Sequence, residues 1–413
     1  MDAVRQVKAF LRSRAIRWRA VLRAKFASMR PRTHGLVVVV SDSPRSREAK
    51  IAYGLQQSGW QVVLLYRQTP TFSNAKYCVD SRRYGDHWEA LYLASHYYPV
   101  AYHVFANCRF MTAATLIRYK PGKIVFDDYD VMAGMLQPEF ANTQYPGELE
   151  LEKYCLENAD GICCRNLETQ YAKRHLGYRF KGPRLLFLDG CWDFADIVPL
   201  SERDRGTVCA TYCGNMNPEK IAPSPGFGDF LWLAKTLSSQ EISFHLFPSA
   251  PDWPGGFENA FSEYRALENE TPYFTLHFPV KPDDLIRQLA AFHLGIHVLG
   301  SSMSTSDMPV YTKAKIRYGI SNKIFDYLDA GLLIIVYEAQ FHRFVLSRYG
   351  VGMTASMQLL GSMRELVTHL DWDELGRRAS RARSAYAVSR NAGRLTRFYS
   401  TLVSAAPNRS LSP

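Results

Sequence analysis

The sequence predicts an α/β protein with two Rossmann-like domains that face a cleft and an amphipathic helix in front of them. Three observations support this prediction: the length of the chain, a repeated alternation of buried strands with helices, and a polar stretch between two such series. At 413 residues, 47% of them hydrophobic and 22% charged, the chain is too long for one ordinary core and too apolar to be disordered. We therefore expect two folded domains.

Residues 1–32 predict a basic amphipathic helix. Apolar side chains recur at three- and four-residue steps over 3–29, so they share a face, and Pro31 ends the pattern. The segment holds ten Lys or Arg and one acidic residue, Asp2. Such a helix can lie on an anionic membrane surface. A helix that packs on the protein itself or on a partner is the alternative. Nucleic acid is disfavoured, because the chain between its two basic ends is nearly neutral.

An alternation of strands and helices over 33–195 predicts the first domain. A β-branched run at 36–40 is followed by a polar turn, a helix over 48–58 and a strand at 60–66. Further buried strands are expected at 102–105, 123–126, 161–164 and 184–187. Continuous apolar strands that alternate with helices are typical of a parallel sheet covered on both faces.

A polar stretch over 196–206, which contains Pro199, predicts a linker to the second domain at 207–375. Strands of that domain are expected at 207–213, 242–247, 274–278, 294–299 and 332–336. We expect a helix over 376–402 that crosses back to the first domain, followed by a tail over 403–413. Ligands of open parallel sheets bind beyond the carboxyl ends of the strands, so the site is expected where the two sheets face each other.

Several classes of protein are disfavoured by missing patterns. The longest apolar runs are far shorter than the roughly 18 residues of a membrane span, and no apolar signal segment is visible. The eight cysteines form no CxxC pair, which favours free thiols in the reducing cytoplasm and no metal site. Neither GxGxxG nor GxxxxGK[ST] occurs, so dinucleotide and NTPase sites lose their main support.

The segment 319–336 (GISNKIFDYLDAGLLIIV) gives the strongest chemical signal. Ser321 or Asn322 can cap a helix that begins near Lys323 and ends at a glycine, with a buried strand after it. Lys323 and the helix N-terminus together would bind a diphosphate. Asp326 lies one turn later on the same side, where it can accept hydrogen bonds from ribose hydroxyls. A capped surface helix with solvated charges is the alternative.

Other polar residues are expected at the ends of strands. Gly214 and Asn215 end the first strand of the second domain, and a glycine there allows a phosphate to approach the backbone, although an ordinary turn has the same sequence. In the first domain, polar residues follow two strands: Ser41, Asp42 and Arg45 after one, and Asp127, Asp128 and Asp130 after the other. Asp127 or Asp42 could act as the base on an acceptor hydroxyl. Caps and turns are the alternative for these carboxylates.

The order of these motifs resembles that of the GT-B glycosyltransferases, specifically the family-4-like group. Residues 321–336 resemble the segment SNKxFEYLAAGxPVV of that group. Further landmarks follow in the family's order at 160–162, 188–193, 212–215, 292–299 and 389–399. The resemblance covers about residues 35–402.

This resemblance implies a hexosyltransferase that needs no metal or other cofactor. It would move a sugar from a nucleotide-diphosphate donor to a glycan or lipid-linked acceptor in cell-surface polysaccharide or glycolipid synthesis, in the cytoplasm or at the inner face of the membrane. The family pattern places the ribose at Asp326 and the diphosphate beside Asn322 and Lys323, with Gly214 and Asn215 near the phosphates.

The chain departs from the family at one position of the donor site. Many members carry a glutamate eight residues before the ribose-binding acid, directed toward the transferred sugar, and here that residue is Tyr318. The contact with the sugar is therefore left open. A nucleotide-sugar epimerase and a catalytically inactive nucleotide-binding member of the same fold are the alternatives.

Overall fold

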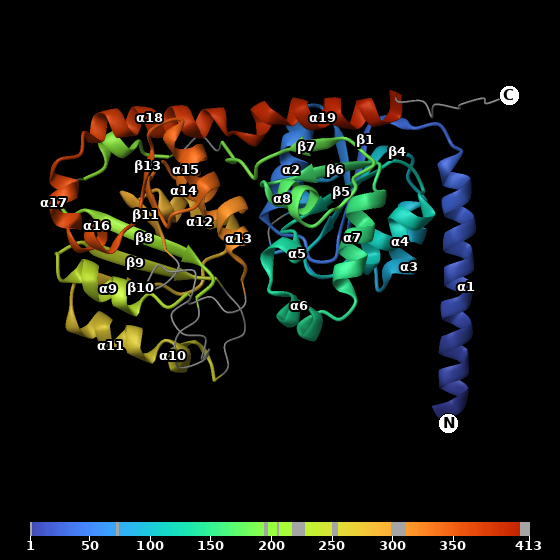
Figure 1. Cartoon of the computed structure of the whole chain (residues 1–413), viewed down its shortest axis with the longest axis horizontal. Helices are drawn as coiled ribbons and strands as arrows, with labels where there is room; N and C mark the ends of the chain where they lie inside the picture. The colour runs from blue at the N-terminus through green and yellow to red at the C-terminus, as the bar shows by residue number, and fades with distance from the viewer. Residues whose placement is uncertain are drawn as a thin grey trace. The chain divides into compact units, whose positions relative to one another are not determined.

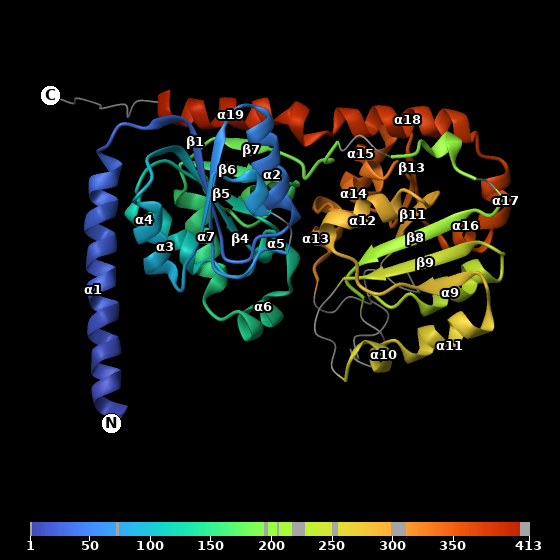
Figure 2. The same ribbon diagram turned by 180° about the vertical axis from the view of Figure 1, so that it is seen from behind.

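The computed structural model describes residues 2–71, 74–193, 197–204, 206–216, 228–249, 255–298 and 311–404. The chain forms two compact units, and each is built on one parallel sheet with helices around it (Figures 1 and 2). The first domain consists of residues 1–189 and 388–413, and the second of residues 190–387. The prediction of two Rossmann-like α/β domains is confirmed.

The sheet of the first domain has seven strands in the order β3-β2-β1-β4-β5-β6-β7, and all neighbours are parallel. The strands are β1 (Thr33–Ser41), β2 (Gln61–Tyr66), β3 (Asp80–Arg83), β4 (Pro99–Ala106), β5 (Ile124–Asp128), β6 (Gly161–Cys164) and β7 (Arg184–Leu186). The run of valines in β1 is buried on both faces, as expected for a central strand. The sequence did not predict β3, an edge strand whose side chains are polar and largely exposed.

Helices cover both faces of this sheet. The helices of this domain are α1 (Asp2–Ser28), α2 (Ser46–Gln57), α3 (His87–Ala94), α4 (Met111–Tyr119), α5 (Met132–Met135), α6 (Pro138–Gln144), α7 (Glu148–Asn158), α8 (Glu168–His175) and α19 (Val388–Ser404), with a 3-10 turn η1 (Asn74–Tyr77). Of these, α1 packs on α3 and α4. One face is buried by α2 and α19, which place Leu55 and Leu395 in the same core. Gly54 permits their close approach, because a Cβ there would lie 2.6 Å from Cγ1 of Val388.

The sheet of the second domain has six parallel strands in the order β10-β9-β8-β11-β12-β13. They are β8 (Cys209–Gly214), β9 (Ser243–Pro248), β10 (Phe274–Leu276), β11 (Leu294–His297), β12 (Leu333–Val336) and β13 (Gly352–Thr354). The helices are α9 (Leu231–Ser238), α10 (Phe257–Ala260), α11 (Ser262–Glu270), α12 (Pro282–Leu289), α13 (Lys313–Tyr318), α14 (Lys323–Asp329), α15 (Gln340–Ser347), α16 (Met357–Gly361), α17 (Met363–Thr368) and α18 (Trp372–Ala385), with a 3-10 turn η2 (Leu200–Glu202).

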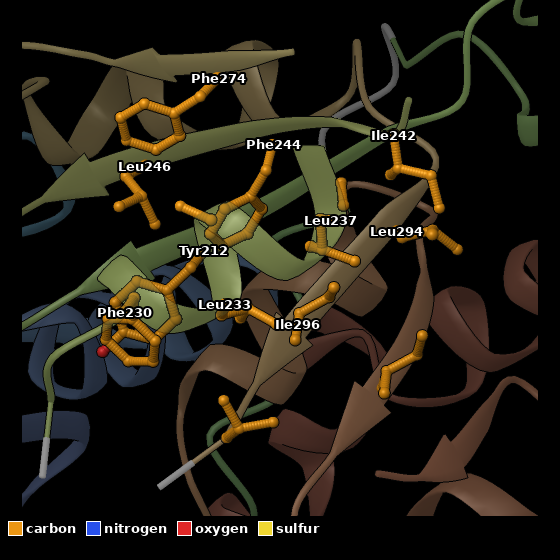
Figure 3. Close-up of a cluster of buried hydrophobic side chains, with 14 of the residues drawn as sticks. Tyr212, Phe230, Leu233, Leu237, Ile242, Phe244, Leu246, Phe274, Leu294 and Ile296 are labelled. Carbon is orange, nitrogen blue, oxygen red and sulfur yellow. The ribbon is translucent and has the colours of Figure 1, made fainter. Parts of the chain in front are cut away.

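Figure 3 shows part of the core on one face of this second sheet. Side chains from β8, β9 and β11 meet those of α9, so that Tyr212, Phe244 and Ile296 pack around Leu233 and Phe230. Alternate residues of each strand point into this cluster, which is the period-two pattern of a sheet face. The burial fixes the register of β8 and thereby places the turn that follows Gly214.

Two boundaries differ from the sequence predictions. In the segment predicted as a linker over 196–206, Leu200 is buried and the guanidinium of Arg203 donates to the backbone oxygens of Val198, Phe292 and Ala330. The described part of that segment therefore packs on the second domain. The single helix predicted over 376–402 is wrong, because α18 ends at Ala385 and α19 begins at Val388.

A pair of histidines in the second domain predicts that the stability of this domain decreases as the pH falls. Nδ1 of His245 lies 2.9 Å from Nε2 of His277, and Nε2 of His245 lies 2.9 Å from Oγ of Ser243. Burial, followed by the charge of His277, lowers the pKa of His245 to about 4 from its ordinary 6.5. The unfolded chain therefore binds more protons below pH 6.5, and this group removes at most about 3 kcal/mol of stability as the pH falls from 6.5 to about 4.

Urea unfolding at several pH values between these limits measures this loss. We expect His245→Gln to flatten the dependence on pH, and His369→Gln, at an exposed position of the same domain, to leave it unchanged. A His245→Gln protein that loses as much stability as the wild type would contradict the assignment.

Candidate functional site

The strand order of each sheet reverses beside its first strand. In the first domain β1 lies between β2 and β4, and in the second domain β8 lies between β9 and β11. Open parallel sheets form their ligand crevice at this reversal, outside the carboxyl ends of the strands. Asp42 follows β1 directly and Gly214 ends β8, so each domain has a predicted site residue at the reversal of its sheet.

In the second domain, the side chain of Lys323 lies across Gly214. A Cβ on Gly214 would come within 2.2 Å of Cε and 2.9 Å of Nζ of Lys323, and the glycine has a φ of 129°. Nζ of Lys323 also lies 5.5 Å from the centroid of the Tyr212 ring. Two motifs that are more than one hundred residues apart in the sequence thus form one cationic surface at the carboxyl end of β8.

The turn after β8 is held by hydrogen bonds from both sides. The backbone N–H of Ser249 donates to the carbonyl of Gly214 at 2.9 Å, and its hydroxyl donates to Oδ1 of Asn215. The hydroxyl of Tyr212 donates to the carbonyl of Asn215 at 2.6 Å. Asn215 itself is exposed. These bonds fix the backbone on which a phosphate would be placed.

The helix α14 places Lys323 and Asp326 half-buried at its surface, because its apolar residues are buried against the sheet. Of the two expected caps, Asn322 occupies the N-cap position but makes no capping bond with its side chain. Oγ of Ser321 instead accepts from the N–H of Lys323 at a long 3.4 Å. The N–H of Ser321 donates to Nε2 of His342 at 2.9 Å.

Tyr327 connects α14 to the two central strands. Its hydroxyl accepts from the N–H of Cys213 at 3.2 Å and donates to the carbonyl of Ile296 at 3.1 Å. Its ring covers Gly295, where a Cβ would lie 2.4 Å from the ring. This packing sets the distance between α14 and β8, and hence the contact of Lys323 with Gly214.

His297 lies close enough to Lys323 for that charge to act on its pKa, and Tyr318 lies five residues before Lys323 in the chain. His297, at the end of β11, was not predicted as a site residue; burial, followed by the charges of Lys323 and His342, holds its pKa well below the ordinary value, so it is neutral near pH 7. Tyr318 ends α13 and is half-buried, with the guanidinium of Arg317 5.5 Å from its ring centroid. The position where the resemblance implied an acid therefore holds an aromatic ring beside a cation.

In the first domain a cavity of about 530 Å³ lies at the carboxyl ends of β1, β2 and β4. Asp42 is in its wall, and Oδ1 of this residue accepts from the hydroxyls of Tyr84 and Thr112, each at 2.9 Å. These two bonds hold the carboxylate in one orientation. The cavity is also lined by residues that the sequence analysis did not single out, namely Arg67, His87 and Arg109. Each comes shortly after a strand or at the start of a helix. This position was the only feature in the sequence that could have indicated a role at the site.

Asp127 does not belong to this cavity wall. It is fully buried and accepts from Nε and Nη2 of Arg47 at 3.1 and 2.8 Å, while Nε2 of His103 lies 3.0 Å away. Nη1 of the same arginine donates to Asp189 at 2.7 Å. Burial acts to raise the pKa of Asp127, but Arg47 and then His103 outweigh it and hold the pKa below the ordinary value. The prediction that Asp127 is the catalytic base is therefore wrong, because no acceptor can reach it.

His103, Asp127 and Cys163 place potential metal-ligand atoms close together. The guanidinium of Arg47 contacts both Asp127 and Cys163, the latter at 3.6 Å from Nη2. A cation of the protein thus already neutralises this cluster, and these residues do not fit a metal ion.

The other residues predicted in the first-domain loops, Ser41, Arg45 and Asp130, differ in burial and in their partners. Ser41 is buried and donates to Oε1 of Glu48 at 2.7 Å, while the N–H of Arg45 donates to Oε2 at 3.0 Å. These bonds form the start of α2, and Ser41 also lies in the wall of the cavity. The side chain of Arg45 is exposed in the cavity wall. Asp130 is half-buried, 3.7 Å from a guanidinium nitrogen of Arg165.

Comparison with known proteins identifies the fold. No family model and no curated protein sequence matches the chain. Sucrose-phosphate synthase from Thermosynechococcus elongatus is similar in structure, with a TM-score of 0.62 and 13% identity over 90% of this chain and 100% of that one. HepE of Anabaena, solved with UDP-glucose, has a TM-score of 0.61 and 11% identity over 89% and 99% of the two chains.

A glycosyltransferase from Rickettsia africae matches with a TM-score of 0.59 and 10% identity, over 91% of this chain and 100% of that one. The chain has the GT-B fold. At these identities the likeness establishes architecture, and the GT-B fold predicted from the order of the motifs is confirmed. In this GT-B protein the surface formed by Gly214 and Lys323 belongs to the second domain and the Asp42 cavity to the first.

Proposed function

We propose that this GT-B protein is a glycosyltransferase that uses a nucleoside-diphosphate sugar as its donor. The contact of Lys323 with Gly214, at the strand reversal of the second sheet, carries this proposal. A diphosphate leaving group needs a cation and a backbone that it can approach closely, and this surface offers both. The fold is shared with HepE, which was solved with UDP-glucose, and with sucrose-phosphate synthase.

Each donor-site residue has a separate part in the proposed reaction. As the bond between the sugar and the diphosphate breaks, negative charge grows on the diphosphate, and Lys323 stabilises it there. Gly214 and the turn at Asn215 let the phosphates lie against the main chain. Asp326, half-buried one turn into α14, accepts hydrogen bonds from the ribose hydroxyls. Because Lys323 and the nearby backbone would stabilise part of the charge of the leaving group, we propose that transfer is independent of a metal ion.

We further propose that the cavity of the first domain binds the acceptor, a glycan or a lipid-linked sugar, and that Asp42 accepts the proton of its attacking hydroxyl. The orientation imposed by Tyr84 and Thr112 supports this role. Synthesis of a cell-surface polysaccharide or glycolipid at the cytoplasmic face of a membrane is the setting that fits such an acceptor. The basic helix α1 supports the peripheral location.

Asp42→Asn tests the role of that carboxylate. The amide keeps the shape and the acceptor oxygen but cannot take a proton, so we expect the turnover number for transfer to fall by about 10²-fold or more. Donor affinity should not change. Asp284→Asn, an exposed carboxylate of α12, is the matched control. Unchanged turnover in Asp42→Asn would exclude it as the base.

A panel of UDP-, GDP-, dTDP- and CMP-sugars tests the proposed function as a whole. The purified protein is incubated with each sugar nucleotide, and the thermal shift and the release of the nucleotide (a nucleoside diphosphate, or CMP from a CMP-sugar) are measured. We expect one base to stabilise the protein and its sugar to be released slowly without an acceptor. Binding without turnover toward any acceptor would favour the inactive nucleotide-binding alternative, for which Tyr318 is the supporting observation. Absence of all nucleotide binding would refute the donor site.

A further inference from the structure

The helix α1 presents two different apolar surfaces. The small residues Ala20, Ala24 and Ala27 are buried, where α1 packs on the first domain beside α3 and α4 (Figures 1 and 2). Four large side chains recur every three or four residues and stay exposed, at 64, 53, 64 and 66% for Trp18, Leu22, Phe26 and Met29. We call these four residues the exposed stripe. The apolar face predicted from the sequence thus has two parts: the small residues are buried against the first domain, and the large ones are exposed. No described helix is long and apolar enough to cross a bilayer.

A groove of about 500 Å³ runs between this helix and the end of α3. Three arginines line it, Arg19, Arg23 and Arg30, together with Tyr92 and Tyr98 from the opposite side. No aspartate or glutamate is among the described residues of its wall. The sequence itself has no acidic residue between Asp2 and Asp42, so neighbouring side chains of α1 provide no negative charge either.

The cations of this groove lack an anion within the described chain. Nε of Arg23 is buried and has no hydrogen-bond partner among the described residues. Burying a charged donor is costly unless it is paired. Three guanidinium groups around one groove match an anion with several acceptor oxygens, since their planar forks bind phosphate in a bidentate manner. A phosphate group meets this need better than a single carboxylate.

We propose that this groove binds the phosphate headgroup of an anionic phospholipid while the exposed stripe enters the boundary of the acyl chains. Leu22 and Phe26 belong to both surfaces, so the headgroup and the acyl region would be contacted by the same two turns of helix. A soluble phosphate compound would leave the stripe in water, where it costs free energy. The inference rests on the peripheral location proposed above and adds a defined site to it; it is independent of sugar transfer.

Sedimentation of the full-length protein with vesicles tests the site. We expect binding to vesicles of phosphatidylcholine with phosphatidylglycerol and little binding to phosphatidylcholine alone. Arg23→Gln should weaken binding to the anionic vesicles about fivefold or more, the change expected for one cation at an anionic surface. Arg30→Gln, at an exposed position, should act in the same direction. Leu22→Ser with Phe26→Ser should weaken binding at least about tenfold.

The controls distinguish a lost lipid site from a general loss of charge and from damage to the donor site. Arg174→Gln makes the same charge change at an exposed position of α8 and should bind vesicles as the wild type does. The thermal shift with UDP should be the same in all variants, so that loss of lipid binding is distinct from failure of the proposed donor site. Equal binding to both kinds of vesicle, or wild-type binding by Arg23→Gln and Arg30→Gln, would overturn the proposal. So would tight binding of glycerol phosphate that the Leu22 and Phe26 substitutions leave unchanged.

Discussion

Arg47→Met is expected to unfold the first domain at a temperature about 10 °C lower than the wild type. The guanidinium of Arg47 is fully buried and pairs with two buried carboxylates, Asp127 and Asp189. Removing one partner of a buried ion pair leaves uncompensated charge and costs about 3–5 kcal/mol. A domain of this size shifts by roughly 2–4 °C for each kcal/mol. Differential scanning calorimetry, with both domain transitions resolved, measures the change.

Two further variants decide whether charge pairing is the cause. Arg174→Met loses an exposed arginine of the same domain and should shift the transition by no more than about 1–2 °C. Arg47→Met combined with Asp127→Asn should lose less stability than the sum of the two single substitutions, because one unpaired charge is removed. Additive losses would show that shape and not charge governs this position.

Lys323→Ala is expected to weaken UDP binding by about 10- to 100-fold, which corresponds to the roughly 1.5–3 kcal/mol of a hydrogen bond with a charged group. Gly214→Ala should have a similar effect for a different reason. Its Cβ would lie 2.2 Å from Cε of Lys323 and would displace that side chain from the phosphate surface. Isothermal titration with UDP measures both. Lys281→Ala, an exposed lysine of the same domain, is the control.

Titration with inorganic pyrophosphate distinguishes the two halves of the donor site. Lys323→Ala should weaken the binding of UDP and of pyrophosphate, because both contain the diphosphate. Asp326→Asn should weaken UDP and leave pyrophosphate unchanged, because only UDP has a ribose. A Lys323→Ala protein with wild-type affinity for both ligands would place the diphosphate elsewhere.

The parts of this protein that follow from local sequence were predictable. The strand β1 and the pair formed by α14 and β12 could be predicted, because a short stretch of their own sequence determines both the secondary structure and its burial. The edge strands β3 and β13 were missed. A strand such as Asp80–Arg83, polar and mostly exposed, exists because β2 pairs with it and not because of its own residues.

The role of Asp127 could not be predicted for a related reason. The arginine that pairs with it lies 80 positions away in the sequence, and a carboxylate after a strand looks the same whether it faces a ligand or the core. The resemblance placed Lys323 and Gly214 near the same phosphates, but their contact was not predicted, because the distance between the two residues depends on Tyr327 and Gly295. Arg67 and Arg109 were overlooked because single arginines after strands are common.

The close contact of α19 with α2 has a consequence for the growing chain. The side chains that close one face of the first sheet, among them Leu395 and Tyr399, come from the last helix of the described sequence. A nascent chain that has not yet emerged beyond Val388 exposes the apolar face of β1 and β4 that this helix covers. The second domain, encoded without interruption by residues 190–387, has all its own strands at that moment. During synthesis, the second domain therefore has its whole sequence before the first domain has the helix that completes its core.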